Sequence, residues 1–330
     1  MNRVAKLSPA ERNELFALTA ERCGFGSVAV VEKDFWVCWT LKRLFEHPEL
    51  SRLLIFKGGT SLSKVFGLID RFSEDIDLIL DWRAVTDENP MAQRSKTKQE
   101  KLNEQVNESA RAYIASDLFR MLDDVLGDYC SLEVNAGEKD LGHIVRVRYP
   151  ETSAAGNLLP YIQLEIGPLG SWLPHSAHTV RSYVTEEFPD QFDDSVCPVR
   201  VIDAERTFWE KATILHHEAN RPETSTVPPR YSRHYYDLFK MAEQTDLKNA
   251  ALADMDLLQS VVEFKQKFYP RGWAKYDQAK PGTLKLIPPK RILDAMRKDY
   301  AAMQEMIFGS RPKFDEIIDG LRDLEREINS

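Results

Sequence analysis

The most restrictive feature of this sequence is a strand, turn, helix and strand pattern in its first quarter. The apolar run 51–57 (SRLLIFK) is typical of a short buried strand, and Gly58 and Gly59 then require a turn. Residues 60–68 (TSLSKVFGL) predict a short helix, and 74–81 (EDIDLILD) alternates as a half-buried strand does. This order of elements indicates an α/β fold.

The second strand carries two carboxylates on one face. Because side chains alternate along a strand, Asp75 and Asp77 project from one side and Ile76 and the leucines from the other. Such a pair can jointly hold divalent ions that bridge a triphosphate, since Mg²⁺ favours a few carboxylates plus phosphate oxygens. The sequence therefore predicts a candidate metal-binding pair.

The glycine turn suits a phosphate chain. A turn that leads into a helix exposes backbone N–H groups, and the hydroxyl of Thr60 or Ser61 can add a further contact. A glycine turn alone most often only reverses the chain, and alternating aspartates often mark an exposed strand face. On consecutive elements, the turn and the aspartate pair together favour nucleotide or phosphate chemistry.

Helical patterns precede this segment. Ser8 and Pro9 are a helix start, and 9–23 has the spacing of an amphipathic helix. A second helix is expected over 34–45 (DFWVCWTLKRLF), where apolar residues recur at helical spacing.

Strand signals return after a polar segment. Residues 83–110 are polar and lysine-rich and suggest a mobile loop running into a helix over 104–126. Both 143–149 (HIVRVRY) and 158–166 (LLPYIQLEI) alternate, as neighbouring strands of one sheet do.

Two domains are expected. From residue 203 onward the pattern is helical and is divided by prolines. We therefore predict an α/β (α+β) domain over 1–200, which includes N-terminal helices within 1–50, and a helical domain over 201–330.

The composition is that of a folded protein. The chain has 330 residues, 43% hydrophobic and 29% charged, which excludes a low-complexity chain. It has no stretch of roughly 18 apolar residues and no signal-peptide pattern, so we expect a cytoplasmic protein without a membrane partner. The four cysteines lie far apart without a C-x-x-C pair and are expected to be buried thiols.

The net charge of −8 does not indicate general affinity for nucleic acid, but the balance reverses locally. Residues 265–298 hold ten basic and two acidic residues, a composition suited to binding phosphates, although basic surface segments are also common without that role. Aromatic residues that could stack on an unpaired base are interleaved there: Phe268, Tyr269, Trp273 and Tyr276. A second, weaker candidate is the loop around Arg94, Lys96 and Lys98.

Residues 56–80 (FKGGTSLSKVFGLIDRFSEDIDLIL) resemble the nucleotidyltransferase signature of the AbiEii/AbiGii toxin family, which includes the MenT toxins and belongs to the DNA polymerase β-like nucleotidyltransferase superfamily. The resemblance implies a polymerase-β-like core with a mixed sheet, an N-terminal helical segment and a C-terminal helical domain. Further blocks follow the family's order and extend the likeness over nearly the whole chain: VEKDFWV (31–37), LPYIQLEIG (159–167), ERTFWEKATILHHEA (205–219), SRHYYDL (232–238) and DYAAMQEMIFG (299–309).

The resemblance implies roles for the residues of the central motif. Gly58, Gly59 and Ser61 would hold the triphosphate of the incoming NTP. Asp75 and Asp77 would bind Mg²⁺ or Mn²⁺.

Two residues of the helical region match further family positions. Lys211 matches the active-site lysine and would supply a cation near the developing charge, although by itself it reads as a surface lysine beside Glu210. Asp237 matches a later aspartate that would orient Lys211 or accept a proton; the other interpretation is an ordinary charge near a helix N-terminus.

Three more residues are candidates from their position. Glu165, on the polar face of a strand, is either a third carboxylate near the acceptor hydroxyl or a half-exposed strand residue. Arg71 and Ser73 flank the aspartate pair and could contact phosphate, although a loop arginine more often pairs with a nearby acid. His216 and His217 have no further ligands at metal spacing and are expected to be ordinary helix residues.

The residues favour nucleotide or phosphate chemistry, and the family resemblance implies transfer of nucleotides from an NTP to RNA, with the 3′ end of tRNA as the expected acceptor. By the same resemblance, the chain would block translation as the toxin of a type IV-like (AbiE-type) toxin–antitoxin or phage-defence system, with a cognate antitoxin as partner. Two other hypotheses remain. The same site could modify a protein or small-molecule acceptor, or the chain could be a non-catalytic nucleotide- or RNA-binding module.

Overall fold

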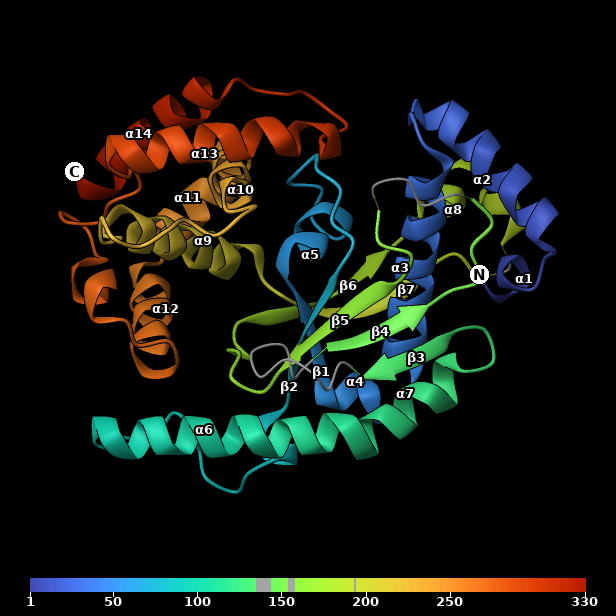
Figure 1. Cartoon of the computed structure of the whole chain (residues 1–330), viewed down its shortest axis with the longest axis horizontal. Helices are drawn as coiled ribbons and strands as arrows, with labels where there is room; N and C mark the ends of the chain where they lie inside the picture. The colour runs from blue at the N-terminus through green and yellow to red at the C-terminus, as the bar shows by residue number, and fades with distance from the viewer. Residues whose placement is uncertain (135–143, 154–157, 193) are drawn as a thin grey trace. The chain divides into compact units, whose positions relative to one another are not determined.

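The structure is a computed structural model, and it describes residues 1–134, 144–153, 158–192 and 194–330. The chain folds into two compact units (Figure 1). The first contains Met1–Val65 and Ser73–Ile202, and the second contains Phe66–Phe72 and Asp203–Ser330. A single boundary at residue 200 therefore does not describe the molecule, because residues 66–72 pack with the C-terminal part of the chain.

A seven-stranded mixed sheet with the order β3-β4-β5-β2-β1-β7-β6 forms the centre of the first unit. β1 pairs antiparallel with β2 and parallel with β7, while β2 pairs parallel with β5. The remaining neighbours are antiparallel pairs. The strands are β1 (Leu54–Lys57), β2 (Ile76–Leu80), β3 (Ser131–Val134), β4 (Ile144–Arg148), β5 (Ile162–Gly167), β6 (His175–Val180) and β7 (Cys197–Ile202).

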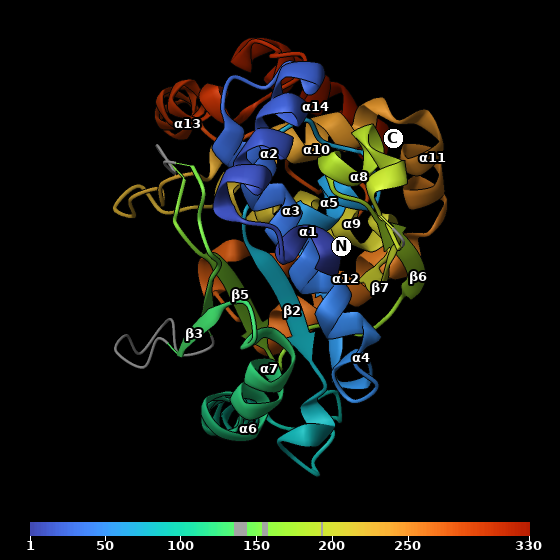
Figure 2. The same cartoon turned by 90° about the vertical axis from the view of Figure 1, so that its right-hand side faces the viewer.

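The register separates an apolar face of this sheet from a face that carries charge. Phe56 pairs with Leu78, which pairs with Ile166, so these buried side chains project to the same side. Helix α3 packs against this apolar side (Figures 1 and 2). The other face carries Asp77 and Glu165, as the alternation of the sequence predicts.

The helices of the first unit include the two expected near the N-terminus. Helix α2 begins after Ser8, whose hydroxyl and backbone N–H form a capping box with Glu11. Helix α3 is buried along almost its whole length, which explains why apolar residues lie all around it. The helices are α1 (Asn2–Ala5), α2 (Pro9–Cys23), α3 (Val28–Glu46), α4 (Leu50–Leu53), α5 (Gly58–Lys64), α6 (Lys96–Tyr113), α7 (Phe119–Leu126) and α8 (Tyr183–Glu187).

The polar segment before residue 110 differs from its prediction. Helix α6 begins at Lys96, so only part of 83–110 is irregular. Its lysines, glutamines and glutamates are strong helix formers, and Leu102, Val106 and Ala110 bury one stripe at helical spacing. A π-helical turn, Ile114–Leu118, joins α6 to α7. The helix predicted over 104–126 therefore starts earlier, and the predicted loop is wrong over 96–103, where the charged residues belong to α6.

The second unit is helical, and the overall α/β class with a mixed sheet and a C-terminal helical part is confirmed. Helix α10 packs against α9, α13 and α14, and α9 also contacts α11 and α12. No helix in the described part of the chain is long and apolar enough to cross a membrane. The helices are α9 (Ala204–Ala219), α10 (Ser232–Glu243), α11 (Thr245–Ala253), α12 (Met255–Phe268), α13 (Lys290–Met303) and α14 (Phe314–Asn329).

The segment 66–72 joins this helical unit through backbone hydrogen bonds. The N–H of Phe72 donates to the carbonyl of Met306 at 2.8 Å, and the N–H of Phe308 donates to the carbonyl of Asp70 at 2.9 Å. Between them, Arg71 and Ile307 form an antiparallel bridge. This pairing fixes Arg71 within the second unit, although the residues that flank segment 66–72 on both sides belong to the first.

Candidate active site

The glycine turn and the aspartate pair meet in the first unit. β1 ends at Lys57, whose register partner on β2 is Asp77, and α5 begins at the next residue, Gly58. Gly58 has φ +85°, and a Cβ there would lie 1.9 Å from Oδ2 of Asp77. Only glycine accepts both the left-handed backbone and this close approach. The turn therefore lies directly against one of the two predicted metal ligands.

Three acidic side chains share the charged face of the sheet. Asp77 on β2 is the register partner of Glu165 on β5, so both project to the same side. Asp75 precedes β2 on that side, and its Oδ1 accepts a hydrogen bond of 3.2 Å from Nε2 of Gln163. Both aspartates are half-buried, whereas Glu165 is exposed.

The electrostatics of Asp75 favour a bound cation. Burial raises the pKa of Asp75, and the negative charges of Glu74 and Asp77 add to this, while Gln163 acts in the opposite direction. A divalent ion would remove this penalty. No group of three or more His, Cys, Asp or Glu side chains at metal-binding distance occurs among the described residues. The two half-buried carboxylates of Asp75 and Asp77 are a donor set of the kind that Mg²⁺ accepts, with water and phosphate oxygens as its other ligands.

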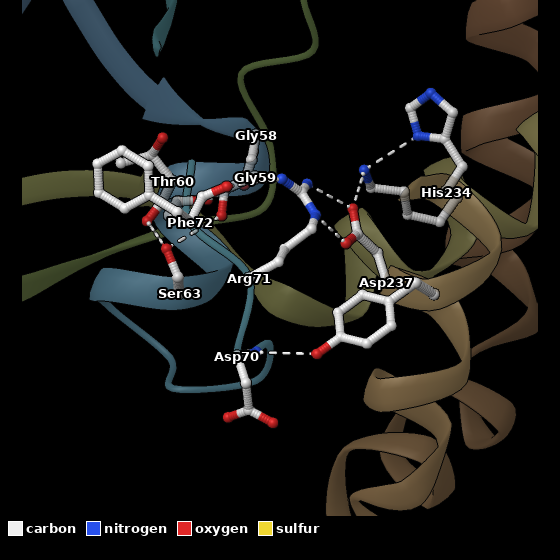
Figure 3. A network of polar contacts seen from close by, with 12 residues as sticks. Gly58, Gly59, Thr60, Ser63, Asp70, Arg71, Phe72, His234 and Asp237 are labelled. Atoms are coloured by element: carbon white, nitrogen blue, oxygen red, sulfur yellow. Dashed lines mark hydrogen bonds and ion pairs between the residues drawn. The ribbon is translucent and has the colours of Figure 1, made fainter. Parts of the chain in front are cut away.

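The hydroxyls of the turn have internal partners. Thr60 donates to the backbone carbonyl of Asp75, and Ser61 donates to the carbonyl of Gly58 at 2.8 Å. Both side chains are fully buried. On α5, Ser63 makes weaker contacts of 3.4 and 3.2 Å to the carbonyls of Gly59 and Thr60 (Figure 3). Thr60 thus ties the turn to the aspartate strand, and phosphate contact by Thr60 and Ser61 stays a prediction.

Helix α3 supports both ends of this motif, which the sequence did not reveal. Nζ of Lys33 donates to Oε2 of Glu74, the residue before Asp75, and to the carbonyl of Leu159 at 2.8 Å. The next residue, Asp34, pairs at 2.7 Å with Lys64, the last residue of α5. The only signal in the sequence was charge inside an otherwise apolar helix.

A second cluster lies within the helical unit, and Figure 3 shows it in close-up. Arg71 binds Asp237 through two hydrogen bonds, Nε to Oδ1 at 2.7 Å and Nη2 to Oδ2 at 2.9 Å. Lys211 on α9 donates to Oδ2 of the same aspartate at 2.7 Å. Nζ of Lys211 also lies 3.2 Å from Nδ1 of His234.

Burial and neighbouring charges shift the pKa values of Asp237 and His234 in this cluster. Burial opposes ionisation of Asp237, but Arg71 and Lys211 together lower its pKa below the ordinary value. Burial and the charge of Lys211 lower the pKa of His234, so the ring is neutral at pH 7 and Nδ1 accepts from Lys211. Arg71 and Lys211 therefore both pair with the carboxylate of Asp237.

Comparison with known proteins then decides the family. The family model of the AbiEii nucleotidyl transferase toxin of type IV toxin–antitoxin systems matches residues 39–320. This chain belongs to the AbiEii toxin family. No curated protein sequence shows significant similarity to it.

Two solved structures resemble this AbiEii family member. MenT4, a nucleotidyltransferase toxin from Mycobacterium tuberculosis, has 17% sequence identity and a TM-score of 0.45, with 95% of this chain and 96% of MenT4 covered. JHP933 from Helicobacter pylori has 14% identity and a TM-score of 0.35, with 91% of this chain and 96% of JHP933 covered.

The structure places the predicted site residues of this AbiEii member in two groups. The first unit holds the glycine turn with Asp75, Asp77 and Glu165, and also half-buried Ser73. The second unit holds Arg71, Lys211 and Asp237. Arg71 pairs with Asp237, an acid from a distant part of the sequence, and its contact with phosphate stays a prediction. The sequence missed His234.

The basic segment of this AbiEii member exposes less aromatic surface than its composition indicated. Phe268 and Tyr276 are buried, Trp273 is half-buried, and Tyr269 is exposed. The guanidinium carbons of Arg221 and Arg271 lie 5.1 and 5.9 Å from the ring centroid of Trp273. A role of this segment in RNA binding stays a prediction.

Proposed function

We propose that this AbiEii toxin transfers nucleotides from an NTP to RNA, at the 3′ end of tRNA, and thereby blocks translation. The observation that carries the proposal is the close approach of Gly58 to the carboxylate of Asp77, with Asp75 beside it. This arrangement brings a glycine backbone suited to phosphate and a carboxylate pair suited to Mg²⁺ into one place. A cognate antitoxin is expected because the family belongs to type IV toxin–antitoxin systems.

The reaction has a defined balance of bonds. The acceptor hydroxyl oxygen forms a bond to the α-phosphorus of the NTP, and the bond from that phosphorus to the bridging oxygen breaks. Pyrophosphate leaves with the electron pair, and the hydroxyl proton passes to a base. We assign Glu165 to this role, since its carboxylate is exposed beside Asp77.

The remaining assignments follow the same chemistry. Asp75 and Asp77 would hold Mg²⁺ or Mn²⁺, which when bound neutralises charge that develops on the phosphate oxygens. Lys211 is assigned, by the family resemblance, to stabilise negative charge of the triphosphate. Asp237 and His234 hold its ammonium group in place, because both accept hydrogen bonds from it.

The test is an incubation with total tRNA, Mg²⁺ and each α-labelled NTP in turn, read on a denaturing gel. Wild-type protein should label tRNA, and the Asp75→Asn, Asp77→Asn double variant should not. A matched control is the Asp315→Asn, Asp319→Asn double variant on the exposed face of α14, which should label as wild type does.

Other outcomes separate the remaining functions. Label on protein, or on an aminoglycoside in the absence of RNA, would replace RNA by that acceptor. If no acceptor is labelled and the Asp75→Asn, Asp77→Asn variant still inhibits growth fully, the chain acts by binding alone and the proposal is wrong.

A further inference from the structure

Two arginines of β4 lie on the same face of the sheet as the acidic side chains of the candidate active site. Arg146 is the register partner of Gln163 on β5, and Gln163 donates to Asp75. Register partners project to the same side of a sheet, and Arg148 lies two residues further along β4 on that side. The arginines and the carboxylates therefore share one face.

The ring of Tyr161 lies close to both guanidinium groups. The guanidinium carbon of Arg146 lies 5.0 Å from the ring centroid of Tyr161, and that of Arg148 lies 5.2 Å from it. All three side chains are half-buried. They present cationic planes and an aromatic ring to solvent, the combination on which unpaired bases stack. We call Arg146, Arg148 and Tyr161 the arginine–tyrosine cluster.

The cluster sets two guanidinium groups against one carboxylate, that of Glu133, which is the register partner of Arg146 on β3. Arg148 pairs with exposed Glu133 on β3, Nε to Oε1 at 3.0 Å and Nη2 to Oε2 at 3.2 Å. Arg146 forms no ion pair with any described residue, and its buried Nε has no hydrogen-bond partner among them. An anionic ligand would satisfy this guanidinium.

The distance between the arginine–tyrosine cluster and the carboxylates allows one RNA strand to contact both. Neighbouring strands lie about 4.8 Å apart, so Arg146, two strands from Asp75, is about 10 Å from it across the sheet. A nucleic-acid strand whose terminal hydroxyl reaches the carboxylates would place its preceding phosphates and bases over this part of the face.

We infer that the arginine–tyrosine cluster binds the single-stranded 3′ end of the RNA acceptor, with the guanidinium groups on its phosphates and bases and Tyr161 in a stack with them. This inference rests on the proposed RNA acceptor. It assigns these residues to acceptor binding and not to the NTP.

The test compares RNA binding with NTP binding in the full chain. The Arg146→Gln, Arg148→Gln variant should bind labelled tRNA at least about tenfold more weakly, and its salt slope should fall by roughly 0.7 for each single-strand phosphate that the variant no longer binds. Affinity for a fluorescent NTP should not change. A matched control is Arg120→Gln on α7, an exposed arginine paired with Asp117, which should match wild type in both assays.

Two further variants separate charge from stacking. The Arg146→Lys, Arg148→Lys variant keeps both positive charges but lacks the planar guanidinium groups. Its affinity for tRNA should fall, while the dependence of that affinity on salt concentration should stay the same. Tyr161→Leu should weaken RNA binding without a change in slope. Thermal melting identifies any variant that fails to fold. If the glutamine variant does not fold, the lysine variant is compared with wild type instead.

The outcomes distinguish this inference from the proposed function. If wild-type protein binds and labels tRNA but the glutamine variant binds it equally well with the same salt slope, only the inference is wrong. If wild-type protein neither binds nor labels RNA, the proposed acceptor is wrong, and the inference falls with it.

Discussion

At the scale of single residues, one glycine couples the two halves of the candidate active site. Gly58 follows Lys57, the last residue of β1 and the register partner of Asp77, and starts α5; its lack of a side chain leaves room for the aspartate carboxylate. The absence of a Cβ at Gly58 therefore allows both the left-handed backbone and the position of the Asp77 carboxylate. A substitution there acts on the aspartate directly.

Gly58→Ala should abolish labelling of tRNA. The new Cβ would lie 1.9 Å from Oδ2 of Asp77, so the carboxylate must move. Gly282→Ala is a matched control, because Gly282 has a similar φ of +84° but nothing within 4 Å of an added Cβ. Both changes place alanine in a left-handed backbone conformation, which costs about 1–2 kcal/mol of stability. The measurement is tRNA labelling by the two variants, compared at a temperature where both are folded. Full activity of Gly58→Ala would show that the position of Asp77 does not matter.

Asp237→Asn should lower the free energy of unfolding by about 3–5 kcal/mol, because it leaves the buried cations Arg71 and Lys211 without a counter-charge. Urea denaturation measures the effect. The control is Asp323→Asn on α14, whose ion pair with Arg326 is largely exposed and should contribute little. A loss as small as that of the control would contradict the account of this cluster.

At the scale of elements, α3 positions the motif through consecutive buried charges. Lys33 and Asp34 hold Glu74 and Lys64, which border the aspartate strand and the turn helix. The residue before them, Glu32, accepts hydrogen bonds from the backbone and hydroxyl groups of Thr152 and Ser153. Charges buried in this way are retained only where each has a partner. Helix α3 therefore supports three separate segments: the end of α5 at Lys64, the residue Glu74 before β2, and residues 152–153.

A double-mutant cycle on Lys33→Met and Glu74→Gln should give a coupling free energy of about 1–3 kcal/mol, since removal of one partner leaves the other charge buried. Unfolding in urea gives the required values. The comparison cycle uses Lys96→Met and Glu100→Gln on α6, an exposed pair 3.9 Å apart. Equal coupling in both cycles would refute a special role for the buried pair.

At the scale of the whole molecule, the chain crosses between its two units three times. It leaves the sheet unit after Val65, returns at Ser73 and leaves again after Ile202. The short excursion brings Arg71 to Asp237 and so completes a buried charge cluster from distant parts of the sequence. Folding of the helical unit therefore depends on residues from the first quarter of the chain.

Stability of the molecule should fall as the pH is lowered from about 6.5. Burial, with the charges of Arg271 and Lys265, lowers the pKa of His217 to about 3, so the folded state stays neutral where the unfolded state binds a proton. The contribution of His217 to the free energy of unfolding is therefore lost between pH 6.5 and about 3, at no more than about 1.4 kcal/mol per pH unit. Asp237 acts in the same direction, because its lowered pKa stabilises the fold only above the unfolded value of 3.8.

Urea unfolding at pH 8, 6, 5 and 4 measures this dependence. His217→Gln should make the curve less steep between pH 6.5 and 4, since glutamine takes up no proton, while buried His234, whose pKa is also lowered, keeps its share of the slope. An unchanged slope in the variant would rule out His217 as a cause of acid sensitivity.

The sequence determined the local elements that have a strong pattern. Alternation along 74–81 predicted which face carries Asp75 and Asp77, and the glycine pair predicted the turn before α5, because both depend on neighbouring residues only. Helical periodicity likewise predicted α2 and the C-terminal helices. The sequence analysis did not predict strands β3, β6 and β7, in which polar residues interrupt the apolar pattern.

Only the tertiary structure decided which distant residues meet. The approach of Gly58 to Asp77, the pairing of Arg71 with Asp237 and the register of Arg146 with Gln163 each depend on how separate segments pack. The free energy of such contacts comes from burial and from charges that find partners far away in the chain, and local spacing carries no record of either. The sequence thus specified the chemical groups of the candidate site, and packing specified their partners.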